Sequence, residues 1–186
     1  VETEGAIRFR GEEISDRPPN GRGKLGISLI PEGRGLFPGL TVMEHLRLGY
    51  IGHDHTRSSD ALYEEVFDLF PRLAERRAQE ATTMSGGEQQ MLAIARGLMS
   101  EPDLLLVDEP TEGLMPTLVD RLRDVLVRLN DEGLSMLLVE QDVDMALDVC
   151  DYGYVIDEGV IQSEGTSAEL RADEEVIEQY LLLGAE

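Results

Sequence analysis

The nine residues at positions 83–91, TMSGGEQQM, combine features that suit the binding of a phosphate group. Ser85 and Glu88 have the spacing of a capping box, in which the two residues exchange hydrogen bonds at a helix start. Gly86 and Gly87 would let a phosphate approach the backbone N–H groups closely, and the helix dipole would attract it. The plainer interpretation is a structural helix cap. A cap needs no pair of glycines, so the pair favours phosphate binding.

Two adjacent carboxylates, Asp108 and Glu109, follow the apolar run LLLV at positions 104–107. A run this uniform predicts a central parallel strand that is covered on both faces. Ligands of parallel sheets bind beyond the carboxyl ends of the strands. Asp108 is placed to hold Mg²⁺ through water, and Glu109 to orient and deprotonate a water that attacks a phosphate. Taken alone, acids after a strand are also typical of a solvated loop.

In their order and spacing these motifs resemble those of the ABC-type ATPases. Residues 84–90 resemble the signature motif, and residues 104–109 resemble the Walker B strand with its catalytic glutamate. Residues 112–114 lie at the D-loop position, Gln141 at the position of the switch histidine, and Glu32 at the Q-loop. The resemblance covers the whole chain and is closest to the ATP-binding subunits of branched-chain amino-acid importers. The segments that carry this closer resemblance are 31–34, 36–38, 40–42, 70–73 and 139–141.

The resemblance implies ATP and Mg²⁺ as cofactors. It implies Asp108 and Glu32 as metal-site residues, and Glu109 and Gln141 as catalytic residues, with Gln141 touching the γ-phosphate. Glu32 and Gln141 depart from the wider family, but they resemble what the branched-chain subfamily carries; a glutamine donates a hydrogen bond without the charge of a histidine. Met115 replaces the usual D-loop aspartate. The implied ATP-binding residues are Ser85, Gly86, Gly87, Glu88 and Glu32.

A phosphate loop of the form G-x-x-x-x-G-K-[ST] and an aromatic residue for the adenine precede these motifs in the resembling family. We expect both to lie upstream of residue 1. Lys24 is the only lysine, and Pro18 and Leu25 stand where such a loop would need Gly and Ser/Thr, so residues 21–24 are predicted to form a turn. Two ATPase domains of the family sandwich ATP head to tail. The 85–87 segment is therefore expected to bind a phosphate that the partner holds.

The resemblance also implies partners and a location. The partners are a second ATP-binding subunit, identical or related, and transmembrane permease subunits; the location is peripheral, at the cytoplasmic face of the cell membrane. Two alternatives remain open. One is a truncated, non-catalytic ABC fragment. The other is a soluble ABC ATPase outside transport, although the long insertions usual in such proteins do not appear between residues 39 and 99.

The expected elements predict an α/β fold, a partial P-loop NTPase of the ABC type with a parallel-sheet core and an inserted helical subdomain. Strands alternate with helices after residue 100, which indicates a parallel sheet. We expect one incomplete ABC ATPase domain, with a core at 1–38 and 100–165, a helical subdomain at 39–99, and C-terminal helices at 166–186. Strands are expected at 6–10, 26–30, 104–107, 135–139 and 154–156, and helices at 41–49, 61–70, 85–99, 116–130, 143–150 and 174–183.

The composition is strongly acidic, with 38 acids against 16 bases and a net charge of −22. Such a charge repels nucleic acid, so we expect no nucleic-acid partner. The single cysteine, Cys150, fits a reducing compartment and is interpreted as a small buried hydrophobe. The acids are scattered along the chain and Lys is almost absent. We interpret this as adaptation to high salt, where screening relieves self-repulsion, in preference to an ordinary acidic protein.

The salt hypothesis makes a direct prediction for the whole chain. Circular dichroism should show unfolding when the ionic strength is lowered to the millimolar range, where the Debye length rises to about 30 Å. The signal should return in molar KCl. Equal free energies of unfolding in both conditions would contradict adaptation to salt.

Overall fold

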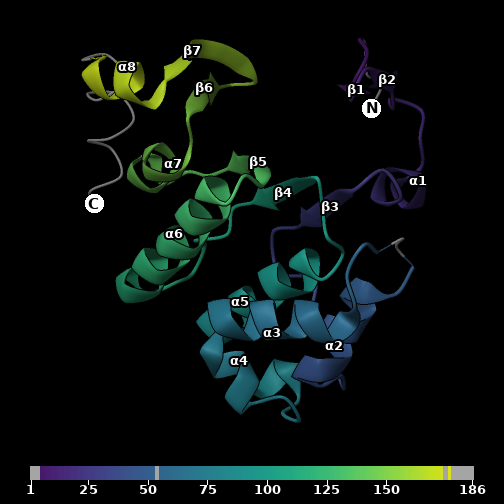
Figure 1. Ribbon diagram of the computed structural model, residues 1–186. Helices are drawn as coiled ribbons and strands as arrows, with labels where there is room; N and C mark the ends of the chain where they lie inside the picture. Colours follow the sequence, from purple (N-terminus) through teal and green to yellow (C-terminus); the bar gives the residue numbers. More distant parts are fainter. Residues whose placement is uncertain (1–4, 53–54, 174–175, 177–186) are drawn as a thin grey trace.

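The computed structural model describes residues 5–52, 55–173 and 176. Its centre is a parallel sheet of three strands in the order β3-β4-β5 (Figure 1). These strands are β3 (Ile27–Ile30), β4 (Leu104–Asp108) and β5 (Ser135–Val139). Leu106 pairs with Leu29 on one side and with Leu137 on the other, so the three side chains share one face. The α/β prediction is confirmed.

Two antiparallel hairpins accompany the central sheet. They are formed by β1 (Arg8–Phe9) with β2 (Glu12–Glu13), and by β6 (Tyr152–Asp157) with β7 (Val160–Thr166). The sequence predicted only the first strand of the first hairpin. The strands there are two residues long, too short for a period-2 pattern to reveal a second one.

The helices connect the strands and cover one face of the sheet. They are α1 (Pro19–Gly23), α2 (Val42–Tyr50), α3 (Ser59–Leu69), α4 (Pro71–Glu75), the 3₁₀ turn η1 (Ala81–Thr83), α5 (Gly86–Leu98), α6 (Pro116–Asp131), α7 (Val143–Val149) and α8 (Ser167–Ala172). In the described part of the chain, no helix has both the length and the apolar character needed to cross a membrane.

Most helix predictions agree with the structure to within one or two residues. Both predicted capping boxes form, at Thr41 with Glu44 and at Ser85 with Glu88. The predicted turn at 21–24 is wrong, because α1 is a short helix with Pro19 at its first position, where proline is well suited. The helix predicted at 174–183 lies outside the described residues, apart from Val176.

The helical segment α2 to α5 forms one packed body that joins the sheet through α5 (Figure 1). Gly49 lies where α2 crosses α5, and a Cβ added there would overlap the carbonyl oxygen of Arg96. At the next residue of α5, a Cβ at Gly97 would overlap Ile30 of the sheet. Glycine at these two positions therefore lets α5 approach both α2 and the sheet closely.

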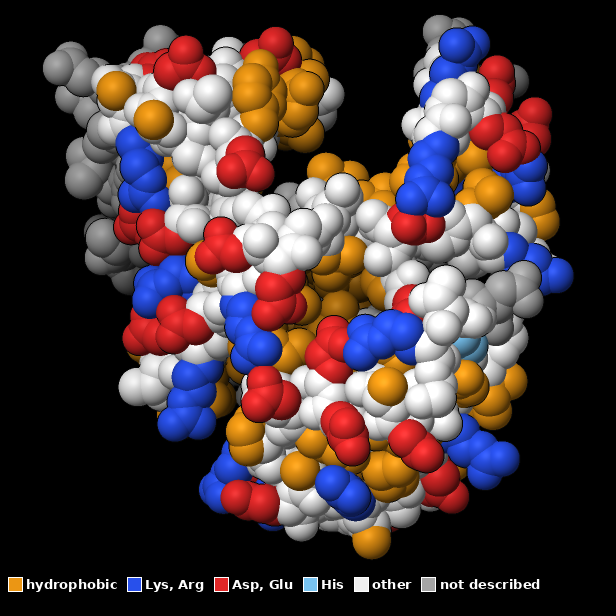
Figure 2. Space-filling model, in the orientation of Figure 1, with side chains coloured by type: hydrophobic (Ala, Val, Ile, Leu, Met, Phe, Trp, Pro, Cys, Tyr) orange, Lys and Arg blue, Asp and Glu red, His pale blue; other side chains and the backbone are white. Residues whose placement is uncertain are grey.

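One face of the sheet is open, which corrects the expectation of a strand covered on both faces. Leu105 and Val107 of β4 are buried, but Leu104 and Leu106 on the opposite face are only half-buried. Their neighbours on that face, Leu29, Leu137 and Val139, are exposed. Figure 2 shows a hollow between the two hairpins with hydrophobic side chains on its floor. The apolar sequence LLLV is compatible with a strand that is buried on one face of the sheet or on both faces.

The close contact at Gly49 generates a stability prediction. Gly49→Ala should lower the free energy of unfolding by about 1–3 kcal/mol, because the backbone of α5 has to move to admit the methyl group. Urea denaturation in molar KCl measures the change. Gly21→Ala is the matched control, since the nearest atom to its added Cβ lies at an ordinary 3.4 Å. Equal behaviour of the two variants would contradict the close α2–α5 contact.

Candidate nucleotide site

The predicted acids lie at the carboxyl edge of the sheet. Asp108 is the last residue of β4 and pairs with Val139, the last residue of β5. It is on the open face, since its register partner Val139 and the half-buried Leu106 are on that face. Glu109 follows directly, and its backbone N–H donates to the Val139 carbonyl at 2.9 Å.

Glu109 and Gln141, the two predicted catalytic residues, are in contact. The Gln141 side-chain amide donates from Nε2 to Oε1 of Glu109 at 2.8 Å. Glu109 has φ of +42°, a left-handed conformation that is uncommon outside glycine and that concentrates at functional sites. This backbone conformation occurs where β4 ends, and the Glu109 carboxylate accepts a hydrogen bond from Gln141, two residues after the end of β5.

The signature residues form the N-terminus of α5. Ser85 is exposed, and its hydroxyl donates to Oε2 of Glu88 at 2.9 Å and accepts from the backbone N–H of Glu88 at 3.4 Å. The backbone N–H of Ser85 donates to the same carboxylate oxygen at 3.1 Å. Ser85 and Glu88 are thus brought together as the capping-box spacing predicted.

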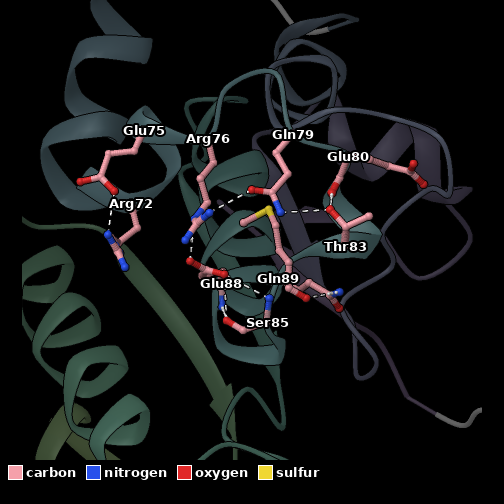
Figure 3. A network of polar contacts seen from close by, with 10 residues as sticks. Arg72, Glu75, Arg76, Gln79, Glu80, Thr83, Ser85, Glu88 and Gln89 are labelled. Carbon is pink, nitrogen blue, oxygen red and sulfur yellow. Dashed lines mark hydrogen bonds and ion pairs between the residues drawn. The ribbon is translucent and has the colours of Figure 1, made fainter.

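Arg76 neutralises the acid beside this helix start. Its Nε lies 2.8 Å from Oε1 of Glu88, and its Nη1 donates to Gln79 at 3.1 Å (Figure 3). Burial of the Glu88 carboxyl opposes its ionisation, but the hydrogen bonds from Ser85 and the charge of Arg76 outweigh it and lower the pKa of Glu88. The sequence analysis gave Arg76 no part in the site. No local pattern could have shown that Arg76 reaches twelve residues along the chain.

The two glycines of the signature each face another part of the chain. A Cβ at Gly86 would meet the guanidinium of Arg34 at 3.2 Å, and a Cβ at Gly87 would overlap a methyl group of Leu118. Arg34 also donates to Oε1 of Gln89 at 3.1 Å. Glycine at both positions therefore allows close packing within the chain. The sequence argument for the glycine pair considered only the approach of a phosphate.

These contacts place the signature near the carboxyl edge of the sheet, although α5 packs on the covered face and Asp108 lies on the open face. Arg34 follows the carboxyl end of β3, and Leu118 follows that of β4, yet both reach the start of α5. Glu32 also follows β3 and is exposed. Hydrogen bonds join Ser85 to Glu88 at the helix start and Glu109 to Gln141 at the strand edge, so the predicted residues lie in two separate groups. The helix dipole and the basic Arg34 and Arg76 make the first group electropositive.

The donor set fits Mg²⁺ only in part. Among the residues that the structure describes, no group of three His, Cys, Asp or Glu side chains converges to hold a metal ion. Mg²⁺ commonly takes one or two carboxylates, with water and substrate phosphates as its other ligands. Asp108 at the strand edge suits that mode, and exposed Glu32 lies at the end of the neighbouring strand.

Comparisons with known proteins identify the class. Residues 1–112 of this chain match the sequence model of the family described as "ABC transporter". The chain is 43% identical over 177 residues to the high-affinity branched-chain amino acid transport ATP-binding protein BraG of Pseudomonas aeruginosa. The aligned region covers 95% of this chain and 76% of that protein. The chain is 37% identical to the probable branched-chain amino acid transport ATP-binding protein LivF of Archaeoglobus fulgidus, over 89% of this chain and 70% of that one.

A solved structure agrees with these relatives. The ADP conformation of an ATP-binding cassette of an ABC transporter superposes with a TM-score of 0.76 at 25% identity, covering 96% of this chain and 77% of that one. The fold and site thus define an α/β protein of the P-loop NTPase class. The chain belongs to the ABC transporter family and is an ABC-type ATP-binding subunit, an ATPase by class.

The packing of Gly87 against Leu118 can be tested by a double-mutant cycle. Gly87→Ala should destabilise the chain because the added methyl group overlaps Leu118, and Leu118→Ala should relieve that overlap. We expect the double variant to be more stable than the sum of the single effects predicts, by about 0.5–3 kcal/mol. Urea denaturation of the four proteins measures the coupling. Additive effects would show that the two residues are not in contact.

Proposed function

We propose that this chain is the ATP-binding, energy-coupling subunit of an importer for branched-chain or related amino acids. The observation that carries the proposal is its 43% and 37% identity to two proteins named for branched-chain amino acid transport. The lipopolysaccharide export protein LptB of Haemophilus influenzae is less similar, at 32% identity. The two higher identities favour import of amino acids over export of lipid.

The start of α5 is proposed to bind the γ-phosphate of a nucleotide held by a second ATP-binding subunit, identical or related. A helix of 13 residues directs its unpaired N–H groups and the positive end of its dipole at this point. Glu88 would repel a phosphate, but Arg76 pairs with it at 2.8 Å and offsets its charge. Arg34, beside Gly86, adds a second positive charge. Ser85 remains exposed and able to bind.

The strand edge is proposed to perform hydrolysis. Asp108 would hold Mg²⁺, with Glu32, which follows the neighbouring strand β3, as a second candidate ligand; the ion would supply charge neutralisation for the phosphate oxygens. Glu109 orients the attacking water and takes its proton. Gln141 donates one of its two amide N–H groups to Glu109, which leaves the other for a phosphate oxygen. This division explains how a glutamine serves where most of the family has a histidine.

The loop after β3 is proposed to transmit closure to a membrane permease, which places the subunit at the cytoplasmic face of the membrane. Phe37 is exposed, while its backbone N–H donates to Nε2 of His45 at 2.9 Å. The other ring nitrogen of His45 lies 2.9 Å from the Thr41 carbonyl, so the buried imidazole is neutral and donates there. Burial lowers the pKa of His45, which keeps it neutral. An exposed aromatic side chain on a firmly held loop suits protein docking.

Calorimetry in molar KCl with Mg²⁺ and ATP tests the proposal, on this chain and on a product extended upstream in its coding region. We expect the extended product to bind ATP and to hydrolyse it. Glu109→Gln should keep binding but lower kcat by about 10²–10⁴-fold, because the general base is lost. Glu64→Gln, an exposed acid on α3, is the control and should leave both unchanged.

The possible outcomes separate the interpretations. Tight binding by the present chain alone would contradict the expectation of an upstream phosphate loop. Binding by neither product would support a non-catalytic fragment. Hydrolysis without stimulation by the permease and solute-binding components of a branched-chain importer would favour a soluble ABC ATPase and contradict the transport assignment.

A further inference from the structure

Glu140 is the residue between β5 and Gln141, and its carboxylate accepts hydrogen bonds from two loops. Oε1 accepts from the backbone N–H of Thr111 at 2.8 Å, and Oε2 accepts from the Thr111 hydroxyl at 2.8 Å. Oε2 also accepts from the backbone N–H groups of Gln141 at 3.1 Å and Asp142 at 3.4 Å. A single half-buried side chain therefore joins the segment after β4 to the segment after β5.

This junction lies directly behind the proposed catalytic pair. Thr111 is two residues after Glu109, and Glu140 is one residue before Gln141. The backbone bond from Glu109 N–H to Val139 ties the same two segments at the strand ends. The clamp from Glu140 to Thr111 adds two hydrogen bonds between these segments. The 2.8 Å contact between Gln141 and Glu109 spans the same gap.

The chemistry of the clamp requires a carboxylate. All four groups that face Glu140 are donors: three backbone N–H groups and one hydroxyl that donates. A carboxylate has acceptor sites on both oxygens and no hydrogen to clash with them. Bonds to an ionised acceptor are also shorter and stronger than neutral ones. A glutamine of the same shape would direct an NH₂ group at one of these donors.

We propose that Glu140 is a positioning residue for ATP hydrolysis, which sets Gln141 against Glu109 by clamping Thr111. The proposal rests on the roles given above to Glu109 and Gln141. Glu140 itself touches neither residue's reacting group. It acts by fixing the separation of the two loops that carry them, and a shift of about 1 Å between reacting groups is enough to slow catalysis about 10²-fold.

A competing explanation is purely local. The bonds from Gln141 and Asp142 to Glu140 lie at the start of α7, where Asp142 is the N-cap and accepts from the backbone N–H of Met145 at 3.0 Å. Glu140 could then merely stabilise this helix start. The two explanations differ at Thr111, because the local one does not need the clamp across the loops.

Nuclear magnetic resonance of the Gln141 side-chain amide distinguishes them without any need for ATP hydrolysis. Its hydrogen-bonded proton should be shifted relative to that of a solvated glutamine. Glu140→Gln should move the Gln141 amide pair to the solvated position. Thr111→Val removes one clamp bond and should move the pair part of the way, while Thr111→Ser keeps the hydroxyl and should leave it unchanged.

The controls make each result decisive. Glu64→Gln, which removes one exposed acid from α3, should leave the Gln141 signal in place. A Gln141 signal that is unchanged in folded Glu140→Gln overturns the proposal. A change in Glu140→Gln with none in Thr111→Val also overturns it, in favour of the local helix cap. If Glu140→Gln does not fold, the pair Thr111→Val and Thr111→Ser decides by itself.

Kinetics then test the consequence for hydrolysis, on the ATP-hydrolysing product described above. Glu140→Gln should lower kcat by about 10²-fold with KM for ATP nearly unchanged, because the clamp orders the loops without binding nucleotide. Thr111→Ser should retain wild-type kcat. An unchanged kcat in Glu140→Gln overturns the role in hydrolysis. If the wild-type protein does not hydrolyse ATP, the proposed function fails, while the spectroscopic result still decides whether Glu140 positions Gln141.

Discussion

The parallel register of β3, β4 and β5 is the constraint on which the site depends. Parallel strands end at the same edge, so the segments that follow them meet there although they are far apart in the sequence. Pairing of Asp108 with Val139 places Glu109 and Gln141 within reach of one hydrogen bond. A shift of one residue in this register would move Asp108 to the other face and separate the pair.

Two arginines, Arg34 and Arg96, connect the loop after β3 to the helical segment, and a third, Arg76, acts within that segment. Arg96 on α5 donates to the carbonyls of Gly35 and Arg34 at 2.6 and 3.2 Å, and Arg34 in turn reaches Gly86 and Gln89. Arg76 donates a hydrogen bond to Glu88 in the first turn of α5. A loop that follows β3 is therefore attached at several points to the helix that carries the signature. Movement of that loop, which carries exposed Phe37, would be transmitted to the start of α5 through these contacts.

The sequence was informative wherever the responsible interaction is local. The capping boxes at Thr41 and Ser85 place two helix starts because the bonds span only three residues. The run 104–107 predicted its strand, and the motif order predicted the family and the ATP-binding class, which the comparisons confirm. The roles of the site residues that the motifs named stay predictions. Local patterns were weaker for the two-residue strands and for α1, where only a few bonds define the element.

What only the tertiary structure decided involves partners distant in the sequence. The pairing of Arg76 with Glu88, the packing of Leu118 on Gly87, and the clamp from Glu140 to Thr111 are set by how helices and loops meet across the sheet edge. The open face of β4 belongs to the same group, because an apolar strand has the same letters whether one face or both are covered. Residue types and spacing determined which chemical groups this chain contains; the register of the sheet and the close approach of α5 decided which of those side chains lie together.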